Sequence, residues 1–136
     1  FKKIALSCTQ GISILICTLL VFLVGMMLGY SDGSVRAMSF VTLIVSNIAI
    51  IFSNRSWSEN IFKILRTPNK TVKWVVGGAV FFLVLVLNIP FLRGLFQFEK
   101  ISFVEGIVCT VVGLISIIWF ECYKLILQNR AQKTCK

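Results

Sequence analysis

Residues 11–30 read GISILICTLLVFLVGMMLGY, without a single charged side chain, and this stretch decides the fold class. A helix that crosses a bilayer needs about 20 mainly apolar residues, which this stretch supplies. Comparable charge-free windows lie between Arg36 and Arg55, between Lys73 and Arg93, and between Glu105 and Glu121. Each window is continuously apolar, whereas the strands of a membrane β-barrel alternate apolar and polar residues. The sequence therefore predicts an all-α, polytopic membrane protein with four transmembrane helices.

The composition excludes other classes of protein. Hydrophobic residues make up 57% of the 136 residues and charged residues 14%, against about 45–50% and about 25% in soluble domains. A chain this apolar does not stay disordered, and at this length it cannot hide so much apolar surface from water. The net charge of +9 is accounted for by membrane topology and attraction to lipid head groups, so no nucleic-acid partner is expected.

The basic residues predict the orientation of the chain. We expect the spans at about 11–30, 37–54, 74–92 and 104–126, within one transmembrane domain over residues 1–136. Two of the 14 Lys and Arg precede the first span, five lie in the connecting loop 55–73, and four lie from Lys124 onward. Cytoplasmic segments carry the excess of Lys and Arg. Both termini, the loop 55–73 and a tail over 127–136 are therefore predicted to be cytoplasmic.

The second span carries a polar stripe, which consists of Ser39, Thr42, Ser46, Asn47, Ser53 and Asn54. At about 100° per residue these side chains fall within roughly a 140° arc, so this face is expected to meet protein or water. Asn47 lies near the middle of the span, where a carboxamide oxygen can replace a water molecule around a cation. Alternatively, the stripe only hydrogen-bonds neighbouring helices, at about 0.6 kcal/mol per bond. Composition alone favours this second interpretation.

The first and third spans offer packing features. Gly25 and Gly29 form a GxxxG pattern, which either seats a partner helix or reflects the abundance of glycine in membrane helices. We expect Tyr30 to lie at the interface and residues 31–34 to form a tight turn. The third span is apolar nearly all round, so it is predicted to be peripheral and lipid-facing, with its helix ended or kinked at Pro90.

The fourth span carries small residues suited to helix packing, namely Cys109, Thr110, Gly113 and Ser116. Glu121 and Lys124 share a helix face near the cytoplasmic interface and are interpreted as a structural pair. The chain has no His, and its five cysteines show no CxxC spacing. We therefore predict no catalytic residue, no bound cofactor and no His-ligated metal site in these residues.

Three motifs occur in a recognisable order. Residues 40–47 read FVTLIVSN and are followed by Arg55-Ser56; residues 90–96 read PFLRGLF; residues 121–124 read ECYK. In this order and topology they resemble the C-terminal transmembrane domain of type II P-type cation-transporting ATPases, the calcium-pump-like branch. The resemblance extends from about Gln10 to about Lys124. It implies that these are the last four of ten spans, and that the chain supports the transport helices of an ATP-driven cation pump, calcium being the expected ion.

The resemblance also implies a site and partners. Asn47 falls where family members have the Glu or Gln that contributes to a cation site, so Asn47 is a candidate ligand of the transported cation. The implied partners are the remaining transmembrane helices and cytoplasmic domains of the same polypeptide, the lipid bilayer and that cation. ATP and Mg²⁺ are implied for the intact pump, but the family's Asp-Lys-Thr-Gly-Thr and Thr-Gly-Glu strings are absent, so this chain is not catalytic alone. The expected location is a bacterial-type plasma membrane.

Two other function classes stay open at this stage. One is a free-standing four-helix membrane adaptor or small transporter unrelated to ATP hydrolysis, which would gain support if the four spans covered one another's polar faces. The other is an intramembrane enzyme, which the scarcity of acidic residues in the spans and the lack of His disfavour. Because the chain begins at Phe1 rather than Met, we expect it to be a piece of a longer protein.

Overall fold

The computed structural model describes residues 2–55 and 70–134, which form five helices. They are α1 (Lys2–Met27), α2 (Asp32–Arg55), α4 (Lys70–Asn88), α5 (Pro90–Phe96) and α6 (Phe103–Thr134), and the described ranges contain no strand. All of these helices except α5 contain a stretch long and apolar enough to cross a membrane. The prediction of an all-α protein with four spans is confirmed.

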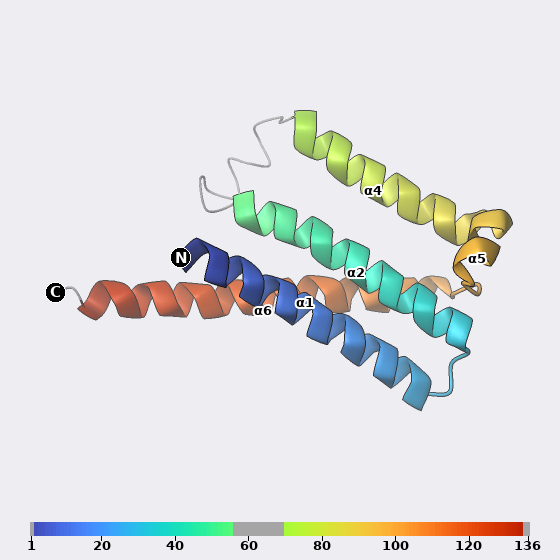
Figure 1. The fold of residues 1–136 in the computed structure, drawn as a ribbon, viewed down its shortest axis with the longest axis horizontal. Helices are drawn as coiled ribbons and strands as arrows, with labels where there is room; N and C mark the ends of the chain where they lie inside the picture. The colour runs from blue at the N-terminus through green and yellow to red at the C-terminus, as the bar shows by residue number, and fades with distance from the viewer. Residues whose placement is uncertain (1, 56–69, 135–136) are drawn as a thin grey trace.

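Helix α2 is the element that joins the others. It packs most extensively against α6, then against α1, and it also contacts α4. The start of α1, the end of α2, the start of α4 and the end of α6 lie at one end of the molecule (Figure 1). The α1–α2 turn and α5 lie at the opposite end, which we call the outer end. This arrangement is the one that two cytoplasmic termini require.

The first helix ends earlier than expected, at Met27 rather than near residue 30. Gly29 has a φ of +80°, a left-handed conformation that glycine adopts without steric cost. The N–H of Tyr30 donates to the carbonyl of Gly25 (3.2 Å) and that of Gly29 to Met26 (3.1 Å), which is a Schellman ending. Gly25, in contrast, is a packing position, because a Cβ there would lie 3.1 Å from Cγ2 of Val35. Only one glycine of the GxxxG pattern therefore serves helix packing, and its neighbour is α2.

The predicted tight turn at residues 31–34 is wrong, because α2 already begins at Asp32. Ser31 takes the N-cap position, and its Oγ accepts a hydrogen bond from the backbone N–H of Ser34 (3.4 Å). Asp32 lies in the first turn, where a negative charge is favourable next to the helix dipole. The connection between the two helices is therefore shorter than the sequence suggested.

The third span also ends early, at Asn88 instead of residue 92. Proline has no N–H and pushes the preceding residue out of the helical region, and Ile89 is indeed extended (φ −79°, ψ 118°). A separate short helix, α5, then starts at Pro90. Val86 is the one buried residue of α4, which agrees with the predicted peripheral position of this helix.

The last helix is longer than the predicted span of 104–126. Its start is capped by Glu105, whose Oε2 accepts a hydrogen bond from the N–H of Ser102 (2.7 Å). No Gly or Pro occurs after Gly113, so nothing local ends the helix before Thr134. Most of the predicted tail 127–136 is therefore a continuation of α6.

At the outer end, residues 31–40 at the start of α2 contact residues 96–99. We call this contact the outer clasp. The Ser31 hydroxyl donates to a carboxylate oxygen of Glu99, and Nη1 of Arg36 donates to Oε1 of Gln97 (2.5 Å). Gln97 ends α5 in the left-handed region, with a φ of 55°. The outer clasp thereby connects α2 to the segment that leads into α6.

Three aromatic rings complete the outer clasp. The ring centroid of Phe40 lies 6.1 Å from that of Phe96 and 5.3 Å from that of Phe98. The rings of Phe96 and Phe98 stack on each other, with centroids 5.5 Å apart. Aromatic pairs at these distances contribute about 0.5–1.5 kcal/mol beyond the area they bury.

Candidate functional site

The polar stripe of α2 is divided between two environments. Thr42 and Ser46 are fully buried and Ser53 is nearly so, whereas Asn47 is exposed. The three hydroxyl residues lie on the side of α2 that meets the other helices, since positions four and eleven residues apart share a helix face. Asn47 follows Ser46 and is therefore rotated by about 100° from it. The stripe, which the sequence predicted to be one continuous face, is therefore buried on one side and exposed on the other.

The buried part of the stripe packs against α6. A Cβ on Gly113 would lie 3.1 Å from Cγ1 of Val45, 3.3 Å from Oγ of Ser46 and 3.3 Å from the carbonyl oxygen of Thr42. The absence of a side chain at Gly113 therefore allows the two helix backbones to approach closely. Cys109, one turn earlier, is buried in the same interface as part of the core with Met38 and Val41. Of the small residues of the fourth span, Cys109 and Gly113 are packing residues, as predicted.

The hydroxyl groups in this interface form few hydrogen bonds. Oγ1 of Thr42 donates to the carbonyl of Met38 (3.0 Å) within its own helix. Oγ of Ser46 and Oγ of Ser39 are buried and have no hydrogen-bond partner among the described residues. The second interpretation of the stripe, in which it only bonds neighbouring helices, therefore fits in part. These hydroxyl groups are buried against neighbouring helices, but they form few hydrogen bonds with them.

At the other end of α2, Ser53 donates a hydrogen bond to a carboxylate oxygen of Glu121 on α6. The sequence analysis paired Glu121 with Lys124, whose side chain lies outside the described residues. Glu121 has further interactions besides the bond to Ser53. The partner on α2 was missed because it is 68 positions away in the sequence, and only a known helix pairing could have suggested it.

Asn47 lies on a face of α2 that these helices leave uncovered. Leu43 and Ile51, one turn to either side of it, are each 36% exposed. Asn47 is about 7 Å from the centre of the span Asp32–Ser53, toward the Ser53 end, at about 1.5 Å per residue. Its carboxamide makes no hydrogen bond within the described part of the chain. An uncovered polar group therefore lies at membrane depth between apolar neighbours.

Further ligands for a cation at Asn47 would have to come from outside the described residues. Within residues 2–55 and 70–134, no three His, Cys, Asp or Glu side chains come together. An amide oxygen is a suitable ligand for a hard cation such as Ca²⁺, which takes about 6–8 oxygen ligands. Asn47 could supply one of them, and among the described residues no cluster of three acidic side chains lies beside it.

Comparison with known proteins identifies the family. Residues 2–126 match the family model described as "Cation transporting ATPase, C-terminus". The chain belongs to this family. It is also similar to "Calcium-transporting ATPase 1" of Yarrowia lipolytica, with 26% identity over 123 residues. This match covers 89% of the chain but 13% of the relative, so the chain spans a small part of that protein's length. The resemblance drawn from the sequence is confirmed, and this cation ATPase domain is an integral, multi-pass membrane domain.

Proposed function

We propose that the chain is the C-terminal membrane domain of an ATP-driven calcium pump, where it holds the transport helices in place and lends Asn47 to the ion pathway. Family membership and the calcium-transporting relative support the pump and the ion. The partners would be the remaining helices and the cytoplasmic domains of the same polypeptide. ATP and Mg²⁺ would bind in those domains, because the phosphorylation string Asp-Lys-Thr-Gly-Thr is absent from this chain.

The exposed position of Asn47 is the observation that carries the proposal. A carboxamide facing hydrocarbon without a hydrogen bond costs about 1–3 kcal/mol by protein measurements, and more in a fully apolar solvent. The face of Leu43, Asn47 and Ile51 is therefore one that protein or water should cover. A free-standing four-helix adaptor would instead bury all its polar side chains, in the way that Thr42 and Ser46 are buried in this chain. This difference favours the pump.

The kind of membrane stays a prediction. The sequence analysis suggested a bacterial-type plasma membrane, and the relative named above comes from a yeast. We retain only the multi-pass membrane location for this chain.

The ligand role of Asn47 is tested in the full-length protein with the variants Asn47→Ala and Leu43→Ala. Leu43 is a matched control, because it lies one turn away on the same exposed face and has no oxygen atom to offer. We expect Asn47→Ala to raise the calcium concentration for half-maximal phosphorylation by about tenfold, which is about 1.4 kcal/mol of binding free energy. Unchanged calcium affinity and stoichiometry in Asn47→Ala would remove Asn47 from the site.

The supporting role is tested separately, by measuring lipid contact. Single labelled cysteines at Leu43, Ile51 and Phe81 are compared in vesicles containing brominated lipids, which quench fluorescence on contact. Phe81 on the peripheral helix α4 is 65% exposed and serves as the lipid-facing reference. We expect strong quenching at position 81 and weak quenching at positions 43 and 51. Equal quenching at all three would mean that lipid, not transport helices, covers this face of α2.

A further inference from the structure

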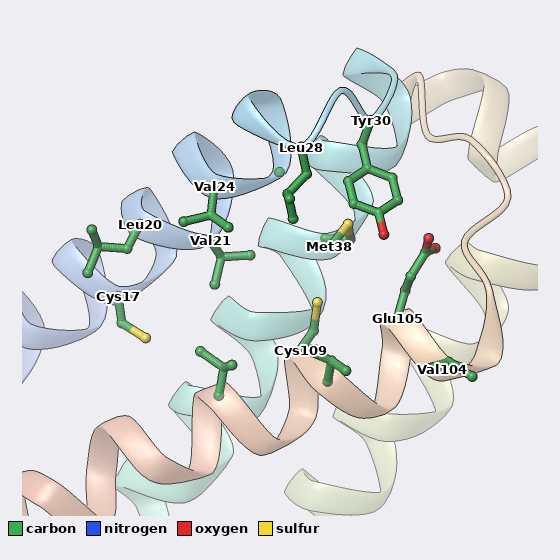
Figure 2. A pocket seen from close by; sticks show the side chains of 13 residues that line it. Cys17, Leu20, Val21, Val24, Leu28, Tyr30, Met38, Val104, Glu105 and Cys109 are labelled. Carbon is green, nitrogen blue, oxygen red and sulfur yellow. The ribbon is translucent and has the colours of Figure 1, made fainter.

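A pocket of about 370 Å³ opens between α1 and α6 near the outer end. Its walls are Leu20 and Val24 of α1, Leu28 just after α1, and Val104, Val108 and Val112 of α6, and Met38 of α2 also lines it (Figure 2). Toward the outer end the helices α1 and α6 diverge from each other (Figure 1). The volume lies in the range of about 300–1,000 Å³ that is usual for small-molecule sites.

The pocket is open on one side. Val24 and Val108, on facing walls, are each 51% exposed, and Val104 is 66% exposed. On one side the lining runs from Cys17 in α1 to Leu28 just after it, a length of about 16 Å at about 1.5 Å per residue. This is about half of the roughly 30 Å hydrocarbon core. The pocket therefore has about the depth of a single leaflet, and its walls are accessible from its open side.

One end of the pocket is polar. The hydroxyl of Tyr30 and the carboxylate of Glu105 lie together at its outer end (Figure 2). Oε2 of Glu105 accepts the N–H of Ser102, and Oε1 accepts no hydrogen bond from the part of the chain that the structure describes. Glu105 is only half-buried, so this oxygen can receive a donor from a ligand. The pocket thus combines long aliphatic walls with a hydrogen-bond acceptor at the depth of the interface.

We propose that this pocket binds a sterol, whose hydroxyl group donates to Glu105 and whose ring system lies along α1 and α6. The charge of the pocket favours a neutral head group. No Lys or Arg occurs among the described residues that line it, and Glu105 is its one carboxylate. A phospholipid would bring its phosphate next to this carboxylate, which is unfavourable for like charges. A sterol brings one hydroxyl donor and otherwise apolar surface.

The sequence adds a second, weaker argument. Leu28, Tyr30 and Arg36 follow the short Leu/Val, Tyr, Lys/Arg pattern that has been suggested for sterol contact. This pattern is frequent in membrane proteins and carries little weight alone. Here the leucine and the tyrosine both line the pocket.

The test uses the full-length protein in phosphatidylcholine vesicles that contain a trace of cholesterol carrying a photoreactive diazirine. After irradiation, labelled peptides are located by mass spectrometry. We expect saturable labelling of residues 17–30 and 104–112, reduced at least fivefold by excess unlabelled cholesterol. Val108→Phe fills the pocket and should abolish this labelling. Val80→Phe is the matched control, because Val80 is similarly exposed (46%) on α4 and does not line the pocket.

A second variant distinguishes loss of labelling through a filled pocket from loss of labelling through misfolding. Val24→Phe fills the same space from the opposite wall, and the calcium-dependent phosphorylation of each variant in sterol-free vesicles reports whether it is folded. The proposal is overturned if folded Val108→Phe and Val24→Phe label like the parent, or if the label spreads evenly over all spans without competition. It is also overturned if excess dioleoylglycerol competes as well as cholesterol, because an acyl chain would then be the occupant.

Discussion

Replacing Gly33 with Ala should destabilise the protein, because the outer clasp has no space for a methyl group there. A Cβ at this position would lie 2.6 Å from Cγ of Glu99, 3.0 Å from N of Glu99 and 3.1 Å from the carbonyl oxygen of Gln97. Two of these three atoms belong to the backbone, so rotating a side chain cannot relieve the contacts. The segment that leads into α6 has to move away from α2.

The size of the effect follows from these distances. Cγ of Glu99 has to retreat by about 0.8 Å, from 2.6 Å to the ordinary contact distance of 3.4 Å. Overpacking of this kind costs about 1–3 kcal/mol. Ala is preferred over Gly in helices by at most about 1 kcal/mol, and Gly33 lies in the first turn of α2, where this preference is weaker. We therefore expect a net loss of about 1–2 kcal/mol.

The assay is thermal unfolding of the full-length protein in detergent, with Gly94→Ala as control. Gly94 is also helical and near the outer end, but a Cβ there meets nothing within 4 Å. Gly94→Ala should be neutral or slightly stabilising, whereas Gly33→Ala should lower the midpoint. In a Glu99→Ala background, Gly33→Ala should cost less, because the atom at 2.6 Å is gone, but the two backbone contacts should keep it destabilising.

Two results would refute this reasoning. If Gly33→Ala unfolded at the same temperature as Gly94→Ala, the outer clasp would not be as close as the structure describes. If the cost of Gly33→Ala were the same with and without Glu99→Ala, the contact with the Glu99 side chain would not be its cause.

Two further substitutions test the contact between α2 and α6. Gly113→Leu should destabilise the protein by about 1–3 kcal/mol in the same assay, because its Cβ already meets α2, while Gly106→Leu, with open space, should have little effect. Ser53→Ala should cost about 1–3 kcal/mol, because the half-buried carboxylate of Glu121 loses a donor. Ser116→Ala removes only a bond within its own helix and should stay within about 0.5 kcal/mol; equal effects of both serine variants would contradict this assignment.

The sequence was sufficient for the existence of the four spans but not for their ends. Hydropathy over about 20 residues is a strong signal, and each predicted span overlaps one observed helix. The ends depend on single residues: Gly29 adopts a positive φ, Ser31 caps α2, and Pro90 separates α4 from α5. Proline was recognised as a helix end, whereas the cap at Ser31 was mistaken for part of a turn.

The candidate site was predicted less completely, because a helical wheel shows which residues share a face but not which helix covers it. The 140° arc contained Ser46 and Asn47 alike, yet α6 buries the former and leaves the latter exposed. Similarly, Glu121 was paired with its neighbour Lys124, and the contact with Ser53 depends on tertiary structure alone. That Asn47 binds a cation stays a prediction.

The dependence of α2 on α6 sets the order in which this domain can be assembled. Thr42, Ser46 and Ser53 are buried by a helix that starts only at Phe103. At about 5–20 residues per second, the roughly 50 residues after Ser53 take about 3–10 s to synthesise. During that interval the face of α2 that carries these hydroxyl groups is not covered by α6. A chain whose synthesis stops before α6 therefore lacks the cover for Thr42 and Ser46 and the hydrogen-bond acceptor for Ser53.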